Sequence, residues 1–459
     1  MELIYNGESK YTIPSNITEI KDENFYFSEL KEITVPGNVK KIGARAFSFS
    51  VKLKKVIIEP GVEEIGESAF ENCDELETVI LPESVTSIGA NAFFSCEKLK
   101  KINLPKNLEI LNEGTFFGCE GLEKIDLPDT LKELGSNLFF DCESLKEITI
   151  PSSVTKIPEG VFVNCKSLAS AVIPDSVQQI ELSAFASCES LSELNIPKNA
   201  EFFASTKNYT DTVDSSRKLT SINIHPQNPY YTSVDGVVYS KDKSTLLGWP
   251  MAKAGEFTVP EEVVSIGEMA FTGAINLTKV FIGKNVKNIG DKAFYNVKSL
   301  EEINVDKNNR TYVSEDGVLY NKDMSVLIAY PNMKKDEIFT VPETVQYLVN
   351  DFEGSENLKK ICLSKNTEQI LGIFENCKNL TDFEVAEGNS VFAGENGVLL
   401  SKDKTAIIQY PQGKKDQCYT IPDTITNIKE KAFFGAKLLK DFKISKHALT
   451  RAMKIKGLK

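Results

Sequence analysis

The chain has 459 residues, too many for one ordinary hydrophobic core, so it holds either several domains or an array of repeats. With 41% apolar and 26% charged residues it has the composition of a soluble folded protein, and no apolar run is long enough to insert into a membrane. The net charge of −12 argues against nucleic acid as a partner, because phosphate binding needs Lys and Arg concentrated on one surface.

The N-terminus lacks the features of a secretory signal. Residues 1–8 have neither a basic start nor an apolar stretch. Either the protein stays inside the cell, or a leader is missing from this chain, and both alternatives remain open. We assign residues 1–29 to a partial repeat that caps the N-terminal end.

Residues 30–200 repeat with a period of 23 residues. The unit reads Leu-x-x-Ile-x-Ile-Pro-x-x-Val-x-x-Ile-x-x-x-x-Phe-x-x-Cys, and phenylalanine, proline and isoleucine or leucine keep their own columns of the same period. The leucine column comprises Leu30, Leu53, Leu76, Leu99, Leu122, Leu145, Leu168 and Leu191.

The first part of each unit predicts a short β-strand. Residues 145–151 alternate apolar and polar side chains, and Pro151 ends the pattern because proline donates no hydrogen bond to a ladder. One such strand cannot bury its own apolar face. We therefore predict that successive units stack into a repeat solenoid with a parallel β-sheet on one face.

Six cysteines recur at the same step of 23 residues. In a stack their Cβ atoms would lie about 5 Å apart and point the same way, whereas a disulfide needs about 3.8 Å and facing vectors. Zinc needs four ligands around one point, and the chain's two histidines, His225 and His447, lie outside these coils. We interpret the cysteines as buried packing residues and expect no metal and no cofactor. They are Cys73, Cys96, Cys119, Cys142, Cys165 and Cys188.

The complete unit, with its Phe and Cys positions, resembles the BspA-type leucine-rich repeat, which is widespread in surface proteins of host-associated anaerobic bacteria and some parasitic protists. The resemblance covers most of the chain. It implies a leucine-rich-repeat right-handed superhelix with a parallel β-sheet on one face and little regular helix. It also implies an adhesin-like protein, on the cell surface or secreted, without assigned catalytic residues.

The second half of the chain departs from the simple period. Residues 201–218 are polar and irregular, and we assign them to an insertion. Residues 219–444 continue the repeats with three longer segments, in which two apolar runs flank a Lys-Asp turn. This pattern predicts three β-hairpin insertions projecting from one side, at about 230–250, 311–331 and 391–411.

The C-terminal residues 445–459 contain five basic and no acidic side chains. A charge run of this kind is usually solvated. We interpret the segment as a basic C-terminal tail or cap.

Two surfaces are candidates for ligand binding. Repeated insertions on one face often bind ligands, so the aromatic residues of the hairpins are candidate contacts, although packing of each hairpin onto its coil is the better explanation. These are Trp249, Tyr330 and Tyr410. The strand face is the other candidate, and its alternative is a solvated face whose charges prevent unwanted strand pairing. Its outward residues include Lys55, Lys101, Asn103, Lys124, Asp126, Glu147 and Thr149.

The sequence contains no glycine-rich phosphate loop, no His-Glu-x-x-His and no Gly-x-Ser-x-Gly. We therefore predict a non-enzymatic, monomeric module that binds a protein or glycan ligand and serves in adhesion at the cell surface. The alternative is an intracellular scaffold for protein–protein interaction, which fits the leaderless start and reduced thiols. A third hypothesis, an enzyme, would require a deep polar pocket with convergent titratable groups.

Overall fold

The described part of the chain is a β-solenoid. The solenoid has about 18 turns with parallel strands, and the described residues form no helix. This confirms the predicted fold class. Most of the predicted insertion (203–214) and all of the predicted tail (445–459) lie outside the described residues. The computed structural model describes residues 7–181, 183–202, 215–349, 352, 354–371, 374 and 376–444.

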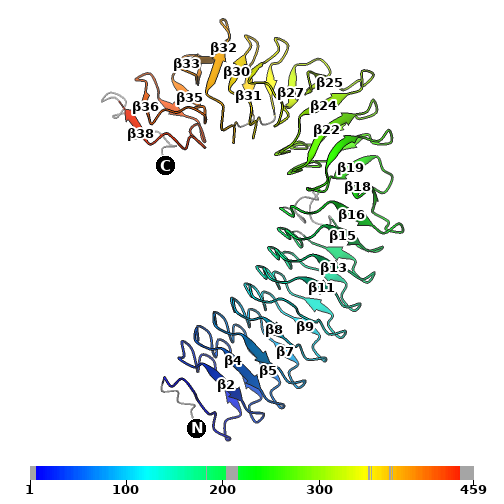
Figure 1. The fold of residues 1–459 in the computed structure, drawn as a ribbon, viewed down its shortest axis with the longest axis vertical. Helices are drawn as coiled ribbons and strands as arrows, with labels where there is room; N and C mark the ends of the chain where they lie inside the picture. Colours follow the sequence, from blue (N-terminus) through cyan, green and yellow to red (C-terminus); the bar gives the residue numbers. More distant parts are fainter. Residues whose placement is uncertain are drawn as a thin grey trace. The chain divides into compact units, whose positions relative to one another are not determined.

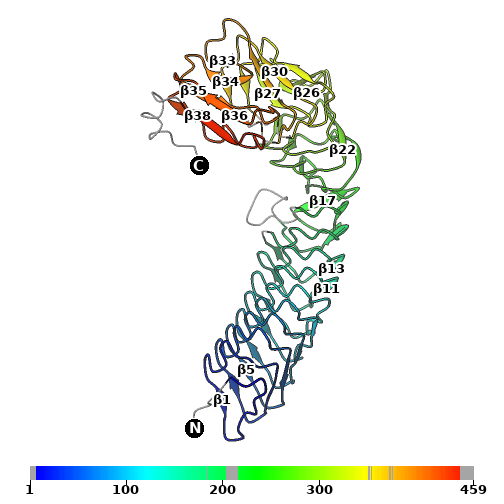
Figure 2. The ribbon, with the colours of Figure 1, turned by 60° about the vertical axis from the view of Figure 1, so that its left-hand side comes forward.

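The chain divides into two compact units. Unit 1 comprises residues 1–253 and 267–270, and unit 2 comprises residues 254–266 and 271–459. Within each unit, the coils follow one another along the stack in chain order (Figure 1). The same stacking is visible after a turn of 60° (Figure 2).

One strand from nearly every coil of unit 1 contributes to a row of parallel strands, whose outward side we call the strand face. In β2 the side chains of Ile33 and Val35 are buried while Glu32 and Thr34 are exposed, as expected for a half-buried strand. The strand ends directly before Pro36, as predicted. The strands of the row are β2 (Glu32–Val35), β4 (Lys55–Ile58), β6 (Thr78–Ile80), β8 (Lys101–Ile102), β11 (Glu147–Thr149), β13 (Ser170–Val172), β15 (Glu193–Ile196) and β16 (Ser221–Ile224).

A second row of parallel strands, which the sequence analysis does not predict, runs along unit 1. Each of its strands has two residues, too few for a readable alternation, and Ile42 for example pairs with Ile65 one coil later. The strands are β1 (Glu19–Ile20), β3 (Lys41–Ile42), β5 (Glu64–Ile65), β7 (Ser87–Ile88), β9 (Ile110–Leu111), β10 (Glu133–Leu134), β12 (Lys156–Ile157) and β14 (Gln179–Ile180).

The core of unit 1 consists of the repeating apolar columns. The rings from Phe25 to Phe185 stack one on the next, with centroids 4.8 to 5.7 Å apart. This distance follows from the spacing of neighbouring strands, about 4.8 Å. Burying one such ring stabilises the fold by roughly 1.5–3 kcal/mol. The stack therefore supplies a large share of the hydrophobic stabilisation.

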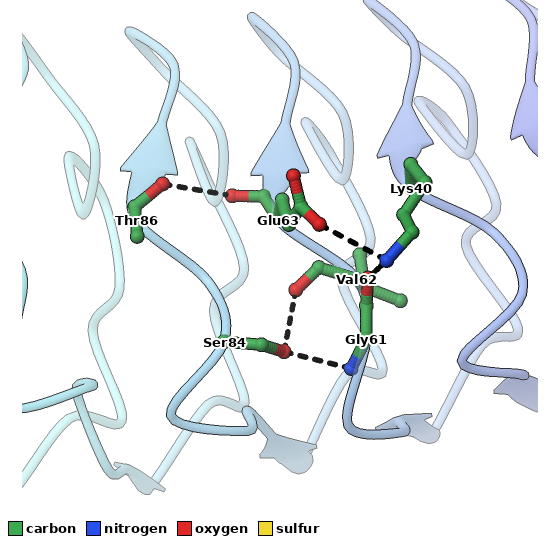
Figure 3. A network of polar contacts seen from close by, with 6 residues as sticks. All are labelled: Lys40, Gly61, Val62, Glu63, Ser84 and Thr86. Atoms are coloured by element: carbon green, nitrogen blue, oxygen red, sulfur yellow. Dashed lines mark hydrogen bonds and ion pairs between the residues drawn. The ribbon is translucent and has the colours of Figure 1, made fainter.

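The polar side chains of unit 1 also connect one coil to the next (Figure 3). The Ser84 hydroxyl donates to the carbonyl of Val62 (2.7 Å) and accepts from the amide of Gly61 (2.9 Å). Lys40 Nζ lies 3.0 Å from both the Gly61 carbonyl and a Glu63 carboxylate oxygen. Hydroxyls at the Ser84 position of later coils likewise donate to the preceding coil, namely Thr130, Ser153 and Ser176.

Unit 2 has both rows as well. The strand-face row comprises β20 (Gly255–Thr258), β22 (Leu277–Ile282) and β24 (Glu302–Val305), then β28 (Ile338–Thr340), β30 (Lys360–Leu363) and β32 (Asp382–Val385), then β36 (Cys418–Ile421) and β38 (Asp441–Ile444). The row of short strands comprises β21 (Ser265–Ile266), β23 (Asn288–Ile289), β29 (Tyr347–Leu348), β31 (Gln369–Ile370) and β37 (Asn427–Ile428).

Three antiparallel groups of strands lie where the sequence predicts hairpin insertions. In unit 2 the third strand of each group also pairs in parallel with the next short strand, β27 with β29 and β35 with β37. These strands thus belong to the solenoid wall, and projecting hairpin insertions are not confirmed. The groups are β17 (Tyr231–Val234), β18 (Val237–Ser240) and β19 (Thr245–Gly248) in unit 1, and β25 (Tyr312–Glu315), β26 (Val318–Asn321), β27 (Val326–Ala329), β33 (Phe392–Glu395), β34 (Val398–Ser401) and β35 (Ala406–Gln409) in unit 2.

A buried asparagine precedes each antiparallel group. Asn309 Nδ2 donates to the carbonyls of Gly283 (2.8 Å) and Val286 (3.0 Å) in the preceding coil. Its Oδ1 accepts from the amides of Thr311 and Tyr312, both at 2.8 Å. Two donor and two acceptor positions of one amide are therefore satisfied. The equivalent residues make four bonds of the same kind, and they are Asn228 and Asn389.

Candidate functional site

The strand face of unit 1 aligns the predicted lysines. Lys55 pairs with Thr78, Thr78 with Lys101, and Lys101 with Lys124. Because parallel pairing stacks equivalent side chains, these residues form one outward row. Glu147 begins the next strand, β11, one coil after Lys124. The structure therefore places the predicted residues on one face, as expected from their spacing.

The strand row is interrupted between β8 and β11. The coil at 124–127 contributes one isolated bridge, Lys101 with Lys124, and β8 has only two residues. The second outward positions there are Asn103 and Asp126, residue types that disfavour strands, whereas β11 carries Thr149 at this position. The local sequence thus explains why the ladder is open at this point.

Asn195 and Asn223 occupy the same second outward position in full-length strands, β15 and β16. The Asn223 Nδ2 donates to the Asn195 Oδ1 at 3.0 Å, and the two strands pair over four residues. A side-chain amide ladder of this kind supports strand pairing. Asn103 and Asp126 lie one coil apart without such a bond among the described contacts, and there the ladder opens.

A hollow of about 160 Å³ lies at this interruption. It brings together four of the seven strand-face residues predicted from the sequence, whereas Lys55, Lys101 and Asn103 lie outside it. The hollow is mostly polar. Its lining consists of Lys124, Ile125, Asp126, Leu127, Asp129, Glu147, Ile148, Thr149 and Pro151.

The charges of the hollow are unbalanced. Lys124 Nζ lies 3.3 Å from Asp126 Oδ1 and 3.9 Å from Glu147 Oε1. All three side chains are more than half exposed, so these ion pairs contribute at most about 1 kcal/mol each. With Asp129 the lining holds three carboxylates and one ammonium. Such a lining favours a ligand that offers positive charge or hydrogen-bond donors.

The hairpin aromatics do not provide exposed contacts. Trp249, Tyr330 and Tyr410 are 2%, 3% and 0% exposed, because their rings pack onto the coils. Trp249 Nε1 donates to the Lys253 carbonyl at 3.2 Å, and the Tyr410 hydroxyl donates to Asp416 at 3.0 Å. This burial agrees with packing of each hairpin onto its coil, the explanation that the sequence favours, and not with exposed contacts.

Unit 2 contains a second polar hollow, of about 370 Å³, that the sequence analysis misses. At its edge Lys334 Nζ lies 3.1 Å from Asp316 Oδ2 and 2.9 Å from Asp336 Oδ2. Burial disfavours the charged ammonium, but the hydrogen bonds to Asp336 and Asp316 outweigh it and raise the pKa of Lys334. A sequence signal exists, because a lysine follows by 18 residues in all three longer segments: Lys253 after Asp235, Lys334 after Asp316 and Lys414 after Asn396. The lining is Glu301, Glu302, Asn304, Ser314, Asp316, Gly317, Lys334, Lys335 and Asp336.

The column of cysteines is buried and unpaired. The Cys119 thiol donates to the Phe93 carbonyl of the preceding coil at 3.2 Å, and burial raises its pKa to about 12. The other five thiols of the column make the same bond. Ser50 and Ser216 donate to the carbonyls of Phe25 and Phe185 at the same position of their coils. The position therefore suits a small buried donor, and a thiolate is disfavoured there.

Among the described residues, no group of three or more His, Cys, Asp or Glu side chains has the arrangement of a metal site. In the same part of the chain, no helix has the length and apolar character needed to cross a membrane.

Comparisons with known proteins point to one family. The model of the BspA type leucine rich repeat region, in six copies, matches residues 7–119, 86–213, 251–325, 329–396 and 414–453. No curated protein matches the chain.

Several solved structures are similar to the chain. A leucine rich cell surface protein from Faecalibacterium prausnitzii is 24% identical with a TM-score of 0.48, covering 83% of this chain and 86% of that one. A leucine-rich repeat protein from Bacteroides ovatus is 22% identical with a TM-score of 0.43, covering 86% and 78%. The pneumococcal vaccine antigen PcpA is 20% identical with a TM-score of 0.26, covering 91% and 80%. Because the family model covers most of the sequence, the chain belongs to the BspA-type leucine-rich-repeat family.

Proposed function

We propose that this chain is a non-enzymatic binding and adhesion module of a cell-surface protein. Its contact surface is the strand face of unit 1, centred on the hollow between Lys124 and Glu147. The ligand is a protein or a glycan that presents positive charge or hydrogen-bond donors. Membership of the leucine-rich-repeat family supports protein binding in general, and the hollow carries the specific assignment.

The gathering of Lys124, Asp126, Glu147 and Thr149 around one open point of the ladder is the observation that supports this surface. Strands β2, β4 and β6 satisfy each other's backbone groups by parallel pairing, whereas the coil at 124–127 makes one isolated bridge. Backbone groups without a ladder partner are available to a ligand. The exposed carboxylates add directional acceptors at the same place.

Catalysis has less support at this site. The hollow of about 160 Å³ is smaller than typical small-molecule pockets, which hold roughly 300–1,000 Å³. Its carboxylates are exposed, and neither a histidine nor a thiol lines it. The lining therefore offers charge and hydrogen bonds for recognition rather than an activated nucleophile.

Binding of the full chain to a glycan array and to purified extracellular proteins tests the proposal. We expect the Asp126→Asn, Glu147→Gln double variant to weaken binding of any captured ligand by about tenfold, since paired charges at the centre of an interface dominate its affinity. The control is the Glu19→Gln, Glu133→Gln double variant, which changes net charge equally at exposed positions of the second strand row. Equal binding by both double variants would refute the site.

The intracellular scaffold remains the alternative role. Labelling of intact cells with a membrane-impermeant biotin reagent separates the two. An adhesion module is labelled before lysis. A chain labelled only after lysis would support the scaffold, while the strand-face variants would still test which surface binds.

A further inference from the structure

One corner of each coil in unit 1 carries a residue with positive φ, at a column that repeats along the stack. Later coils place small or polar residues there, which tolerate the left-handed region. These are Asn72, Ser95, Gly118, Asp141, Asn164 and Ser187. The first two coils instead carry Phe27 (φ 55°) and Phe49 (φ 60°). A bulky side chain in this region is strained, and persisting strain often marks a functional position.

The two aromatic residues belong to an exposed apolar patch. Phe27 is 61% exposed and stacks on Phe49, with ring centroids 4.9 Å apart. Tyr26 meets the Phe27 ring edge-on at 4.5 Å, and Val51, two residues after Phe49, is 41% exposed. We call Tyr26, Phe27, Phe49 and Val51 the corner patch. Phe27, a strained aromatic residue that is largely in water, brings the folded chain little burial in return.

The column that contains Val51 changes from an apolar to a charged residue along the stack. Every later coil of the regular repeats places a charged residue at this position, namely Asp74, Glu97, Glu120, Glu143, Lys166 and Glu189. Backbone hydrogen bonds from Gly121 to Glu97 and from Ser144 to Glu120 fix these coils in line. The apolar corner patch is thus continued by a line of acidic residues on the same corner, except at Lys166, which forms an ion pair with Glu143.

The carboxylates of this line repel one another. Partial burial raises the pKa of Glu120, and the carboxylates of Glu97, Glu143 and Asp141 raise it further. A cationic partner would relieve this repulsion. A second copy of this chain would not, because each copy carries a net charge of −12.

Most polar groups around the corner patch are already paired within the chain; the exception is Arg45 Nε, which is buried and has no partner among the described residues. Arg45 Nη2 donates to the Tyr26 hydroxyl at 3.0 Å, and Arg45 Nη1 lies 3.7 Å from Glu23. Lys52 forms an ion pair with Glu29. A sugar needs directional donors and acceptors for its hydroxyls, whereas an apolar side chain needs only apolar contact. The patch therefore fits the apolar side chain of a protein better than a glycan.

We propose that the corner patch and the adjoining carboxylates bind a protein segment in which an aromatic or aliphatic anchor is followed by basic residues. The anchor packs on the open face of Phe27 and against Val51. The basic side chains pair with Asp74, Glu97 and Glu120 along the next coils. This surface is separate from the strand-face hollow and goes beyond the function proposed above.

Selection of a random-peptide phage library on the full chain tests this proposal. We expect the wild-type chain to enrich peptides that join an apolar anchor to Arg or Lys, and the Phe27→Asn variant to lose this enrichment. Asparagine tolerates positive φ, so this variant should unfold at the same temperature as wild type or higher. The enriched peptide is then synthesised and labelled. It should bind about tenfold more weakly than to wild type to the Phe27→Asn variant and to the Glu97→Gln, Glu120→Gln double variant.

Two control variants locate the effect. Asn72→Ser changes the same corner column outside the patch, and Lys124→Glu changes the strand-face hollow; both should bind the peptide like wild type. Loss of binding in Lys124→Glu alone would move the site to the strand face and overturn this proposal while leaving the other intact.

Other outcomes overturn the proposal directly. They are the absence of an enriched peptide, equal enrichment on Phe27→Asn, or enrichment without basic residues. Binding of a glycan array that is lost in Phe27→Asn would identify a sugar site instead. A dimer in light scattering that dissociates in Phe27→Asn would identify a second copy as the occupant.

Discussion

The regular coils of unit 1 and the longer segments of unit 2 pack their aromatic rings differently. In unit 1 the rings of Phe116 and Phe139 lie parallel, with an interplanar angle of 4° and centroids 5.7 Å apart. In unit 2 Tyr330 and Phe339 meet at 64° with centroids 4.9 Å apart. A strict 23-residue period places the same ring at the same point of every coil, so translation alone stacks them. Where longer segments break the period, rings of different origin meet edge-on.

The difference extends to the polar interior. The regular coils of unit 1 place a thiol or hydroxyl that donates one hydrogen bond, as Cys119 does to Phe93. Each longer segment instead starts with a buried asparagine that makes four, as Asn309 does. Repetition lets many weak equivalent contacts define the fold, whereas an interruption requires a single residue with several directional bonds.

The largest effect is expected in the phenylalanine stack. Phe116→Ala should lower the free energy of unfolding of unit 1 by about 4 kcal/mol, because it leaves a cavity between two parallel rings. Guanidinium unfolding followed by circular dichroism measures this value. Phe117→Ala, at a half-buried neighbouring ring, should cost clearly less. Equal losses for both variants would contradict a stack that depends on buried rings.

Loss of the buried Asn309 amide, which precedes the antiparallel group β25–β27, should have the second largest effect on stability. Asn309→Ala leaves two carbonyls and two amides without their partner, and we expect a loss of roughly 3 kcal/mol. Hydrogen exchange should show faster exchange at Thr311 and Tyr312 than in unit 1. Asn308→Ala, at the exposed neighbour, is the matched control. Unchanged exchange in Asn309→Ala would show that this amide does not hold the coil.

The cysteine column should tolerate a conservative change. Cys119→Ser keeps a small donor to the Phe93 carbonyl, as Ser50 and Ser216 do in their own coils, so we expect a loss of about 1 kcal/mol or less. Cys119→Leu should cost more because of overpacking. Thermal unfolding of the two variants measures both losses of stability. A larger loss for serine than for leucine would show that the position requires apolar character, not a donor.

The smallest effect concerns acid stability at the turn between β18 and β19. Hydrogen bonds from Ser240 and Ser244 hold the pKa of Asp242 at about 2, below its ordinary 3.8. Because the folded pKa is the lower one, the stabilising contribution is present above about pH 4 and is lost as the pH falls toward 2. Asp242→Asn should flatten the dependence of unfolding on pH in this window. A carboxyl that titrates near pH 4 in the folded chain by NMR would refute the assignment.

The sequence predicts the stack well because periodic side chains translate directly into periodic contacts. The Leu and Phe columns, the strand ends before proline and the buried thiols all follow from one period. The row of two-residue strands has no alternation to read, and nothing local distinguishes Asn309 from an exposed loop residue. Site prediction is weaker still. Spacing places Lys124 and Glu147 on one face, but the hollow between them depends on where the ladder opens, and the strain at Phe27 depends on a dihedral angle.

The buried thiols can report local opening of the coils. Cys418 is exposed, whereas the column from Cys73 to Cys188 places one buried thiol in each of six coils. A thiol reagent added to the native protein would modify Cys418 at once and reach the column only through transient opening of individual coils. Mass-spectrometric timing of each modification would then show how readily each of these six coils opens, without any engineered probe.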